Sequence, residues 1–262
     1  MNARGSAMTP LNIHYFLETT ELSGGVRVVL DQARALTMRG HRVIVRANRG
    51  DHTWYPYPVE IQYRTDFSQP LDGTDPDVVI GTFWTTIGPA MDTGAPLVVH
   101  LCQGCEWLMP EYAPMKADIQ AAYAMPIPKI TIGDWLSSLI FDRFGRNRFS
   151  VKSVGQIVDK DLYEEQSIRK RRRGASESSP WRILVVGIYE AWVKGITTAL
   201  AAVEHIRGEG FNIHLTRVST FPLSEEERKK FQVDSYHQCA TPVQMARLYR
   251  DADIFLAPSR SA

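Results

Sequence analysis

Short apolar segments alternate with helical segments along most of the chain, and this alternation constrains the fold more than any other feature. In the first part of the chain, the expected strands are residues 12–17, 41–45, 59–63, 77–81, 97–101 and 129–132. The expected helices between them are residues 26–39, 111–123 and 135–144. Near-continuous apolar strands that alternate with helices are typical of parallel sheets covered on both faces. The pattern therefore predicts an α/β fold.

The alternation begins again further along the chain. The expected strands there are residues 182–187, 211–218 and 254–257, and the expected helices are residues 196–207, 224–231 and 241–250. Ser224 is an expected N-cap with Glu227 at the capping-box position, and Thr241 is another with Pro242 at N1. The last strand is expected to be buried. The Pro-Ser pair at 258–259 turns the chain at its carboxyl end, the edge where open α/β sheets bind ligands.

The stretch between the two series is polar. Residues 169–173 read Arg-Lys-Arg-Arg-Arg, and a Gly-, Ser- and Pro-containing segment follows up to residue 180. No aromatic residues interleave the basic run, which favours a solvated linker over a site for nucleic acid or anionic lipid. We therefore expect an N-terminal domain over residues 1–160, a linker over 161–180, and an incomplete second domain over 181–262.

Composition excludes several functional classes. The 262 residues carry a formal net charge of +1, so nucleic acid is not an expected partner. Hydrophobic residues make up 44% and charged residues 23%, as in ordinary globular proteins. No apolar run approaches the ~20 residues of a membrane span, and the N-terminus has no signal-peptide core. We expect a cytoplasmic location, and we also consider peripheral contact with the inner face of the membrane.

The chain has three cysteines, and two of them form the C-x-x-C pair Cys102 and Cys105. An odd, low number argues against a disulfide framework. A zinc or redox site would need a second ligand pair or a thioredoxin-like context. His100 adds one ligand to the pair, but a fourth is missing. We expect reduced thiols and no metal.

Two loops join a strand to a helix in the position of phosphate-binding loops. Gly24 and Gly25 precede the first helix and allow a ligand to approach the backbone and the helix N-terminus closely; a plain tight turn is the alternative. Gly187 opens the second loop, which ends in Lys194 and Gly195. The Lys194 ammonium could join the helix N-terminus in holding a diphosphate, and a solvated surface lysine is the alternative. The glycine fingerprint of dinucleotide-binding folds and the P-loop pattern are absent from the sequence.

His100 lies at the carboxyl end of an expected strand and is followed by Gln103 and Glu106. An imidazole there could donate a hydrogen bond to a ligand or act as a general base. The alternative is a structural histidine at the strand end.

Taken in order, several of these segments resemble the GT-B glycosyltransferases of family 4 (group 1). The resemblance rests on residues 23–25 (Ser-Gly-Gly), 39–41 (Arg-Gly-His), 185–187 (Val-Val-Gly), 194–195 (Lys-Gly) and 248–259 (Leu-Tyr-Arg-Asp-Ala-Asp-Ile-Phe-Leu-Ala-Pro-Ser). Residues 102–106 (Cys-Gln-Gly-Cys-Glu) and 132–136 (Ile-Gly-Asp-Trp-Leu) are similar to the rhamnosyltransferase-type branch. The resemblance extends from about residue 12 to 261.

The resemblance implies two Rossmann-like parallel-sheet domains and transfer of a sugar, with retention, from a nucleotide-sugar donor. The first domain would bind a glycan or lipid-linked acceptor of polysaccharide biosynthesis, the second the donor, with no metal or other cofactor. Positive charge at Lys194 and the helix dipole would stabilise the leaving diphosphate. The residues carried over to the donor site are Gly24, Gly25, Gly187, Lys194, Gly195, His237 and Ser259, and those with catalytic roles are His100 and Glu106.

The sequence departs from the family pattern in two places. Ile188 and Tyr189 stand where an arginine usually follows the glycine at 187. After Ser259 the family continues into a Glu-Gly-Phe-Gly loop and a helix with two glutamates, which this sequence does not contain. The main hypothesis is therefore a truncated retaining glycosyltransferase. The two alternatives are an inactive remnant that acts as a binding module and a GT-B nucleotide-sugar epimerase. The missing glycine fingerprint disfavours a dinucleotide-dependent oxidoreductase.

Overall fold

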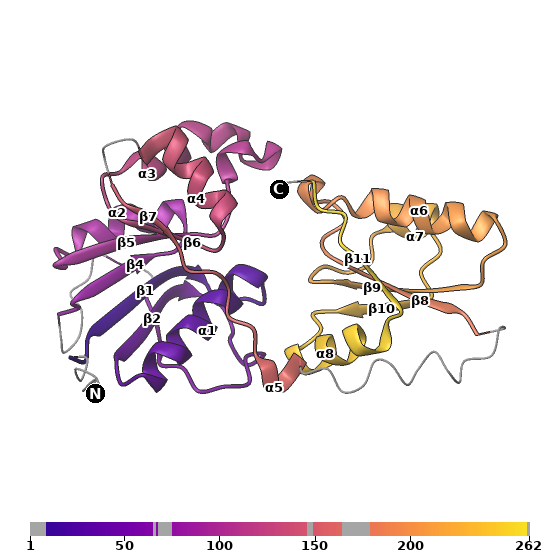
Figure 1. The fold of residues 1–262 in the computed structure, drawn as a ribbon, viewed down its shortest axis with the longest axis horizontal. Helices are drawn as coiled ribbons and strands as arrows, with labels where there is room; N and C mark the ends of the chain where they lie inside the picture. Colours follow the sequence, from indigo (N-terminus) through magenta and orange to yellow (C-terminus); the bar gives the residue numbers. More distant parts are fainter. Residues whose placement is uncertain (1–8, 65–66, 68–74, 146–148, 164–178, 261–262) are drawn as a thin grey trace, which may run out of the picture. The chain divides into compact units, whose positions relative to one another are not determined.

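The computed structural model describes residues 9–64, 67, 75–145, 149–163 and 179–260. The chain divides into two compact units, Met1–Ile157 and Val158–Ala262 (Figure 1). Each unit contains its own parallel sheet with helices on both faces, so the predicted α/β architecture of two Rossmann-like domains is confirmed. The basic run at 169–173 and most of the expected linker lie outside the described residues.

The sheet of the first unit has seven parallel strands in the order β3-β2-β1-β4-β5-β6-β7. They are β1 (Asn12–Thr19), β2 (Arg42–Arg49), β3 (Ile61–Tyr63), β4 (Val78–Gly81), β5 (Leu97–Cys102), β6 (Lys129–Thr131) and β7 (Val151–Ser153). Six of these match the expected strands; β7 was not expected, because its sequence, Val-Lys-Ser, contains no apolar run. Alternate residues of β1, including Tyr15 and Leu17, are buried in the same core as Val29 and Leu30 of the first helix.

The first unit has four α-helices among its described residues. They are α1 (Gly24–Met38), α2 (Trp84–Asp92), α3 (Lys116–Ala124) and α4 (Asp134–Ile140), with 3₁₀ turns η1 (Glu106–Leu108) and η2 (Pro110–Met115) and a π turn η3 (Phe141–Gly145). The single helix expected over 111–123 is wrong in its first half, which is the 3₁₀ turn η2. Pro114 cannot donate a backbone hydrogen bond, and its ring crowds the preceding turn, so α-helix begins only at Lys116.

The sheet of the second unit has four parallel strands in the order β10-β9-β8-β11. They are β8 (Trp181–Val186), β9 (Ile213–Ser219), β10 (Ser235–Gln238) and β11 (Ile254–Leu256). The helices are α5 (Lys160–Tyr163), the 3₁₀ turn η5 (Trp192–Lys194), α6 (Ile196–Gly208), α7 (Glu225–Lys230) and α8 (Pro242–Asp251). Within this unit α6 and α7 cover one face of the sheet and α8 covers the other (Figure 1).

Both expected N-caps in the second unit are confirmed, but the carboxylate of Glu227 pairs with Arg217 and does not complete a capping box at Ser224. Ser224 Oγ accepts a hydrogen bond from the Glu227 amide at 3.1 Å. Thr241 and Gln244 form a reciprocal capping box, with Pro242 at N1. The Glu227 carboxylate accepts a hydrogen bond from Arg217, on a neighbouring strand, and is 1% exposed.

Two expectations about the strands of the second unit are wrong. The last strand, β11, is not buried: Ile254 is 40% and Phe255 45% exposed, because β11 is at the edge of the described sheet and pairs only with β8. The strand β10 was not expected. Its sequence, Ser-Tyr-His-Gln, contains no apolar run, and its pairing with β9 defines it instead.

Candidate functional site

Gly187 ends β8 with a backbone conformation that favours glycine. Its φ is +146°, and a Cβ at this position would lie 2.9 Å from Cδ1 of Ile196 and 3.5 Å from Cβ of Lys194. The absence of a side chain therefore allows the loop to pack closely against the start of α6. As a result, Gly187 and Lys194, two of the residues predicted to bind the donor, are neighbours.

Gly195 is the N-cap of α6 and has a left-handed conformation, with φ of +63°. A Cβ there would lie 2.1 Å from the carbonyl oxygen of Pro258, so the turn after β11 packs directly on this glycine. Ser259 follows in that turn. The structure thus brings together, at the carboxyl edge of one sheet, the second glycine loop and the turn at 258–259, which the sequence separates by more than 60 residues.

The N-terminus of α6 is electropositive. The helix has 13 residues, its N-cap is a glycine without a capping side chain, and its first turn, which is fully described, contains no acidic residue. Unpaired N–H groups and the helix dipole give such an end a partial positive charge. Lys194 adds a full positive charge one residue before the cap. This arrangement suits an anion such as a diphosphate.

A buried ion pair that was not expected from the sequence supports the second glycine loop. Arg217 on β9 is 0% exposed and Glu227 on α7 is 1% exposed; Arg217 Nε donates to Glu227 Oε1 at 2.6 Å. Arg217 Nη1 and Nη2 both donate to the carbonyl of Gly187 at 3.2 Å, and Nη1 also donates to that of Val185 at 3.2 Å. The guanidinium therefore fixes the backbone where β8 becomes the loop.

A signal for this pair exists in the sequence. Ile213, Leu215 and Arg217 alternate along β9, so Arg217 occupies an inward-facing position after two core residues. A buried charge in such a position requires a partner. The identity of that partner, however, depends on how α7 packs, and the sequence does not specify it.

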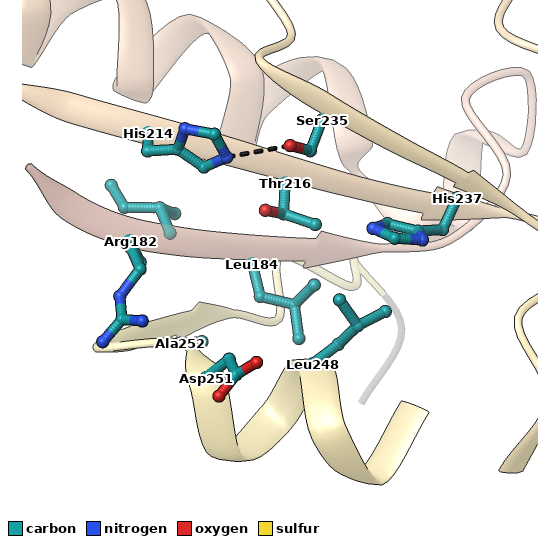
Figure 2. A pocket seen from close by; sticks show the side chains of 10 residues that line it. Arg182, Leu184, His214, Thr216, Ser235, His237, Leu248, Asp251 and Ala252 are labelled. Atoms are coloured by element: carbon teal, nitrogen blue, oxygen red, sulfur yellow. Dashed lines mark hydrogen bonds between the residues drawn. The ribbon is translucent and has the colours of Figure 1, made fainter. Parts of the chain in front are cut away.

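His237 lies away from this loop. It lines a hollow of about 310 Å³ on the face of the sheet that α8 covers (Figure 2). Lys194 instead precedes α6, which covers the other face. In the same hollow, His214 Nε2 and Ser235 Oγ are 2.9 Å apart and hydrogen-bonded. The lining residues are Arg182, Ile183, Leu184, His214, Thr216, Ser235, His237, Leu248, Asp251 and Ala252. Of the predicted donor-site residues in this unit, the hollow is lined by His237 and not by Gly187, Lys194, Gly195 or Ser259.

In the first unit, the glycine loop begins α1. Ser23 Oγ accepts a hydrogen bond from the amide of Val26 at 3.2 Å and caps the helix. Gln103, after β5, donates from Nε2 to the carbonyl of Gly25 at 3.2 Å. A Cβ at Gly24 would meet no atom of the unit within 4 Å, so packing within the chain does not require glycine there. The two segments that the sequence singled out, 23–25 and 102–106, therefore meet.

His100 and Glu106 differ in their surroundings. His100 is 1% exposed, and its ring lies 4.7 Å from that of Tyr123. Burial, and then the charge of Lys129, lower the pKa of His100 to about 3, so the ring is neutral at pH 7. Glu106 is half-buried, and its Oε2 accepts a hydrogen bond from the Tyr123 hydroxyl at 2.6 Å. His100 thus packs against the tyrosine that holds Glu106. This agrees with the alternative hypothesis that His100 is a structural residue at the end of the strand.

The cysteines are free thiols: Cys102 and Cys105 are buried, and Cys239 is exposed. In the part of the chain that the structure describes, no three His, Cys, Asp or Glu side chains gather in a way that could hold a metal ion. None of the described helices combines the length and apolar character needed to cross a membrane.

No protein-family model matches the chain, and no curated protein matches it significantly. The chain does match several solved structures in fold. A glycosyltransferase from Rickettsia africae ESF-5 aligns over 95% of this chain and 73% of its own, with a TM-score of 0.57 and 12% identity. Anabaena HepE in complex with UDP aligns over 96% and 75%, with a TM-score of 0.63 and 13% identity.

A UDP-N-acetylglucosamine 2-epimerase from Rickettsia bellii aligns over 96% of this chain and 70% of its own, with a TM-score of 0.52 and 8% identity. Identities this low show a shared fold and no more. The two parallel sheets, with their strand orders, and these similarities show that the chain has the GT-B fold of glycosyltransferases.

Proposed function

We propose that this chain binds a nucleotide-sugar through its second unit and transfers the sugar, with retention, to a glycan or lipid-linked acceptor of polysaccharide biosynthesis. The observation that carries the proposal is the convergence of Gly187, Lys194, Gly195 and the turn at 258–259 on the N-terminus of α6. The similarity to HepE, whose structure contains UDP, supports a nucleoside diphosphate as the anion.

The chemistry of sugar transfer requires positive charge at this position. As the bond between the sugar and the diphosphate breaks, negative charge accumulates on the leaving oxygen. Lys194 and the α6 N-terminus would stabilise that charge without rearranging, because Gly187 and Gly195 are held by packing. We propose that the reaction therefore needs no metal, and that chelation with EDTA leaves its rate unchanged.

We propose different roles for the two predicted catalytic residues. Glu106 is half-buried, so its carboxylate can accept hydrogen bonds from acceptor hydroxyls. His100 acts through Tyr123 as a positioning residue, since its ring has no exposed surface to offer a substrate. Glu106→Gln should lower the rate of transfer while the affinity for the donor nucleotide stays the same.

Calorimetry with UDP, GDP and dTDP tests the donor site. Lys194→Ala should weaken the preferred diphosphate tenfold or more, which corresponds to about 1.4 kcal/mol. Lys229→Ala is the matched control, because Lys229 lies on α7 with its side chain 76% exposed and pairs with Glu225. Unchanged affinity in Lys194→Ala would remove this lysine from the site.

Product analysis separates the proposed transferase from its alternatives. Incubation with UDP-sugars, GDP-sugars and dTDP-sugars should release free nucleoside diphosphate, through transfer or slow hydrolysis. Conversion of the donor to an epimer with no diphosphate released would instead support an epimerase, the alternative that the similarity to the Rickettsia bellii enzyme favours. Binding without turnover would support an inactive binding module.

A further inference from the structure

Arg260 lies at the same helix end as Lys194. Its backbone amide donates to the carbonyl of Val193 at 2.8 Å. Its Nη2 donates to Thr198 Oγ1 at 3.1 Å, and Thr198 is the third residue of α6. Residues with long cationic side chains, Lys194 of the 3₁₀ turn η5 and Arg260 of the turn after β11, therefore both lie at the N-terminus of one helix.

This placement is electrostatically unfavourable in the free protein. Cations are stabilised at the C-terminus of a helix and destabilised at the N-terminus. The first turn of α6 contains no carboxylate that could offset the two charges. The nearest acidic residue along the loop is Glu190, for which the described contacts include no ion pair with Lys194 or Arg260. A bound anion would convert the repulsion into attraction.

The guanidinium is nevertheless held in place. Its carbon lies 5.1 Å from the centre of the Trp192 ring, so the tryptophan provides a cation–π platform although it is itself 55% exposed. Guanidinium has five N–H donors, and the bond to Thr198 uses one of them. A planar group with free donors, fixed beside a helix N-terminus, is suited to bidentate binding of phosphate oxygens.

A purely structural role does not require this side chain. The turn at 258–260 is already attached to η5 by the backbone bond from Arg260 to Val193, and to α6 by the packing of Pro258 on Gly195. Any non-proline residue at position 260 could form that backbone bond. Among the described contacts, Thr198 and Trp192 hold its guanidinium, and none of its partners is a carboxylate.

We propose that Arg260 is the second cationic ligand of the donor diphosphate and that Trp192 positions it. This role rests on the proposed function of the α6 site. A diphosphate has the second phosphoryl group that a monophosphate lacks, so Arg260 makes the site selective for diphosphates.

Calorimetry with UDP and UMP on the full chain tests the proposal. Arg260→Gln should weaken UDP at least tenfold and UMP less than threefold, so that the preference for UDP collapses. Arg260→Lys keeps the positive charge but loses the bidentate guanidinium and its cation–π contact with Trp192. Its affinity for UDP should lie between those of the wild type and Arg260→Gln. Trp192→Leu should weaken UDP three- to tenfold. Arg247→Gln, an exposed arginine on α8, should change neither affinity.

The outcomes distinguish this inference from the proposed function. If the wild-type chain binds UDP and Lys194→Ala weakens it, while Arg260→Gln binds UDP normally, Arg260 is not a ligand and the proposed donor site still stands. If Arg260→Gln weakens UDP and UMP equally, selectivity for the second phosphate is refuted. If the wild-type chain binds no nucleoside diphosphate, both proposals fail. Matching melting temperatures of wild type and Arg260→Gln exclude unfolding as the cause.

Discussion

One buried ionisable side chain in each sheet, His100 in the first and Arg217 in the second, shows a different way of accommodating such a group. In the first unit, His100 is 1% exposed and is discharged, with a pKa of about 3. In the second unit, Arg217 is 0% exposed and pairs with Glu227. Burial penalises the charged form of a group, so an imidazole loses its proton, whereas a guanidinium cannot and needs a partner. The stability of the sheet with the neutral His100 therefore depends on pH, whereas that of the sheet with Arg217 depends on the geometry of the ion pair.

The carboxyl edges of the two sheets also differ in the groups that they offer to a ligand. Behind the first edge lie two neutral groups, His100 and Tyr123, and the buried Lys129 ammonium, which donates to the carbonyls of Met125 and Ile127; Tyr123 holds one half-buried carboxylate. Behind the second edge lies a paired guanidinium that holds the Gly187 carbonyl beside a cationic helix end. The first environment suits the hydroxyls of a neutral sugar, and the second suits a phosphate.

The largest expected effect comes from breaking the buried pair. Arg217→Ala leaves Glu227 charged, buried and unpaired, and should destabilise the second unit by about 3–5 kcal/mol. Hydrogen exchange with mass spectrometry should show lost protection in residues 181–260 and little change in residues 9–157. Equal loss in both units would contradict the assignment of this pair to the second unit alone. The exposed pair Lys229–Glu225 is the control, since removing it should change stability little.

A double variant separates the two roles of Arg217. Arg217→Leu with Glu227→Leu removes both charges, and should recover much of the stability that the single variants lose. The Gly187 carbonyl then has no guanidinium to hold it, so affinity for UDP should stay low. Normal affinity in a stable double variant would show that the pair does not position the loop.

The next effect tests the discharged histidine. Its pKa is lowered from 6.5 to about 3 in the folded chain, so below pH 6.5 the unfolded chain binds more protons and stability falls as pH falls. From these values, His100 should cost the first unit roughly 2–3 kcal/mol between pH 7 and pH 4.5. His14, with a pKa lowered to about 4 by burial and by Arg46 and Arg42, acts in the same direction.

Urea unfolding at pH 7 and pH 4.5 measures this loss. His100→Gln removes the titrating group and should reduce the difference between the two pH values, even if the variant is less stable at both. The second unit should show a smaller dependence in this range. An unchanged pH dependence in His100→Gln would mean that this histidine is not the group responsible.

The sequence predicts most of the fold because most of the strands are apolar and alternate with helices. It fails where pairing, and not composition, defines a strand. The polar strand β10 has no apolar run, and β11 is apolar but lies at an exposed edge. Strand order decides both, and residue patterns do not encode strand order directly.

The residues of the candidate site also fall into those that the sequence predicts and those that it does not. Gly187, Lys194 and Gly195 could be predicted, because a loop between a strand and a helix must lie at the carboxyl edge of a parallel sheet. Arg217 and Arg260 could not, because each acquires its role from a partner distant in sequence: Glu227 for the first, and Trp192 with Thr198 for the second. Their charges are visible in the sequence, but their contacts follow only from packing.

The smallest effect tests whether the two glycine loops are held with different strength. Gln103 donates one neutral hydrogen bond to the Gly25 carbonyl, whereas Arg217 donates two charged ones to that of Gly187. Gln103→Ala should therefore cost about 0.5–1.5 kcal/mol, measured by urea unfolding at pH 7. Gln103→Met, which keeps the length of the side chain but cannot donate, should lose as much. A loss in either variant that equals the loss in Arg217→Ala would remove the contrast between a neutral and a charged donor, since the charge of the donor would then have no bearing on how firmly each loop is held.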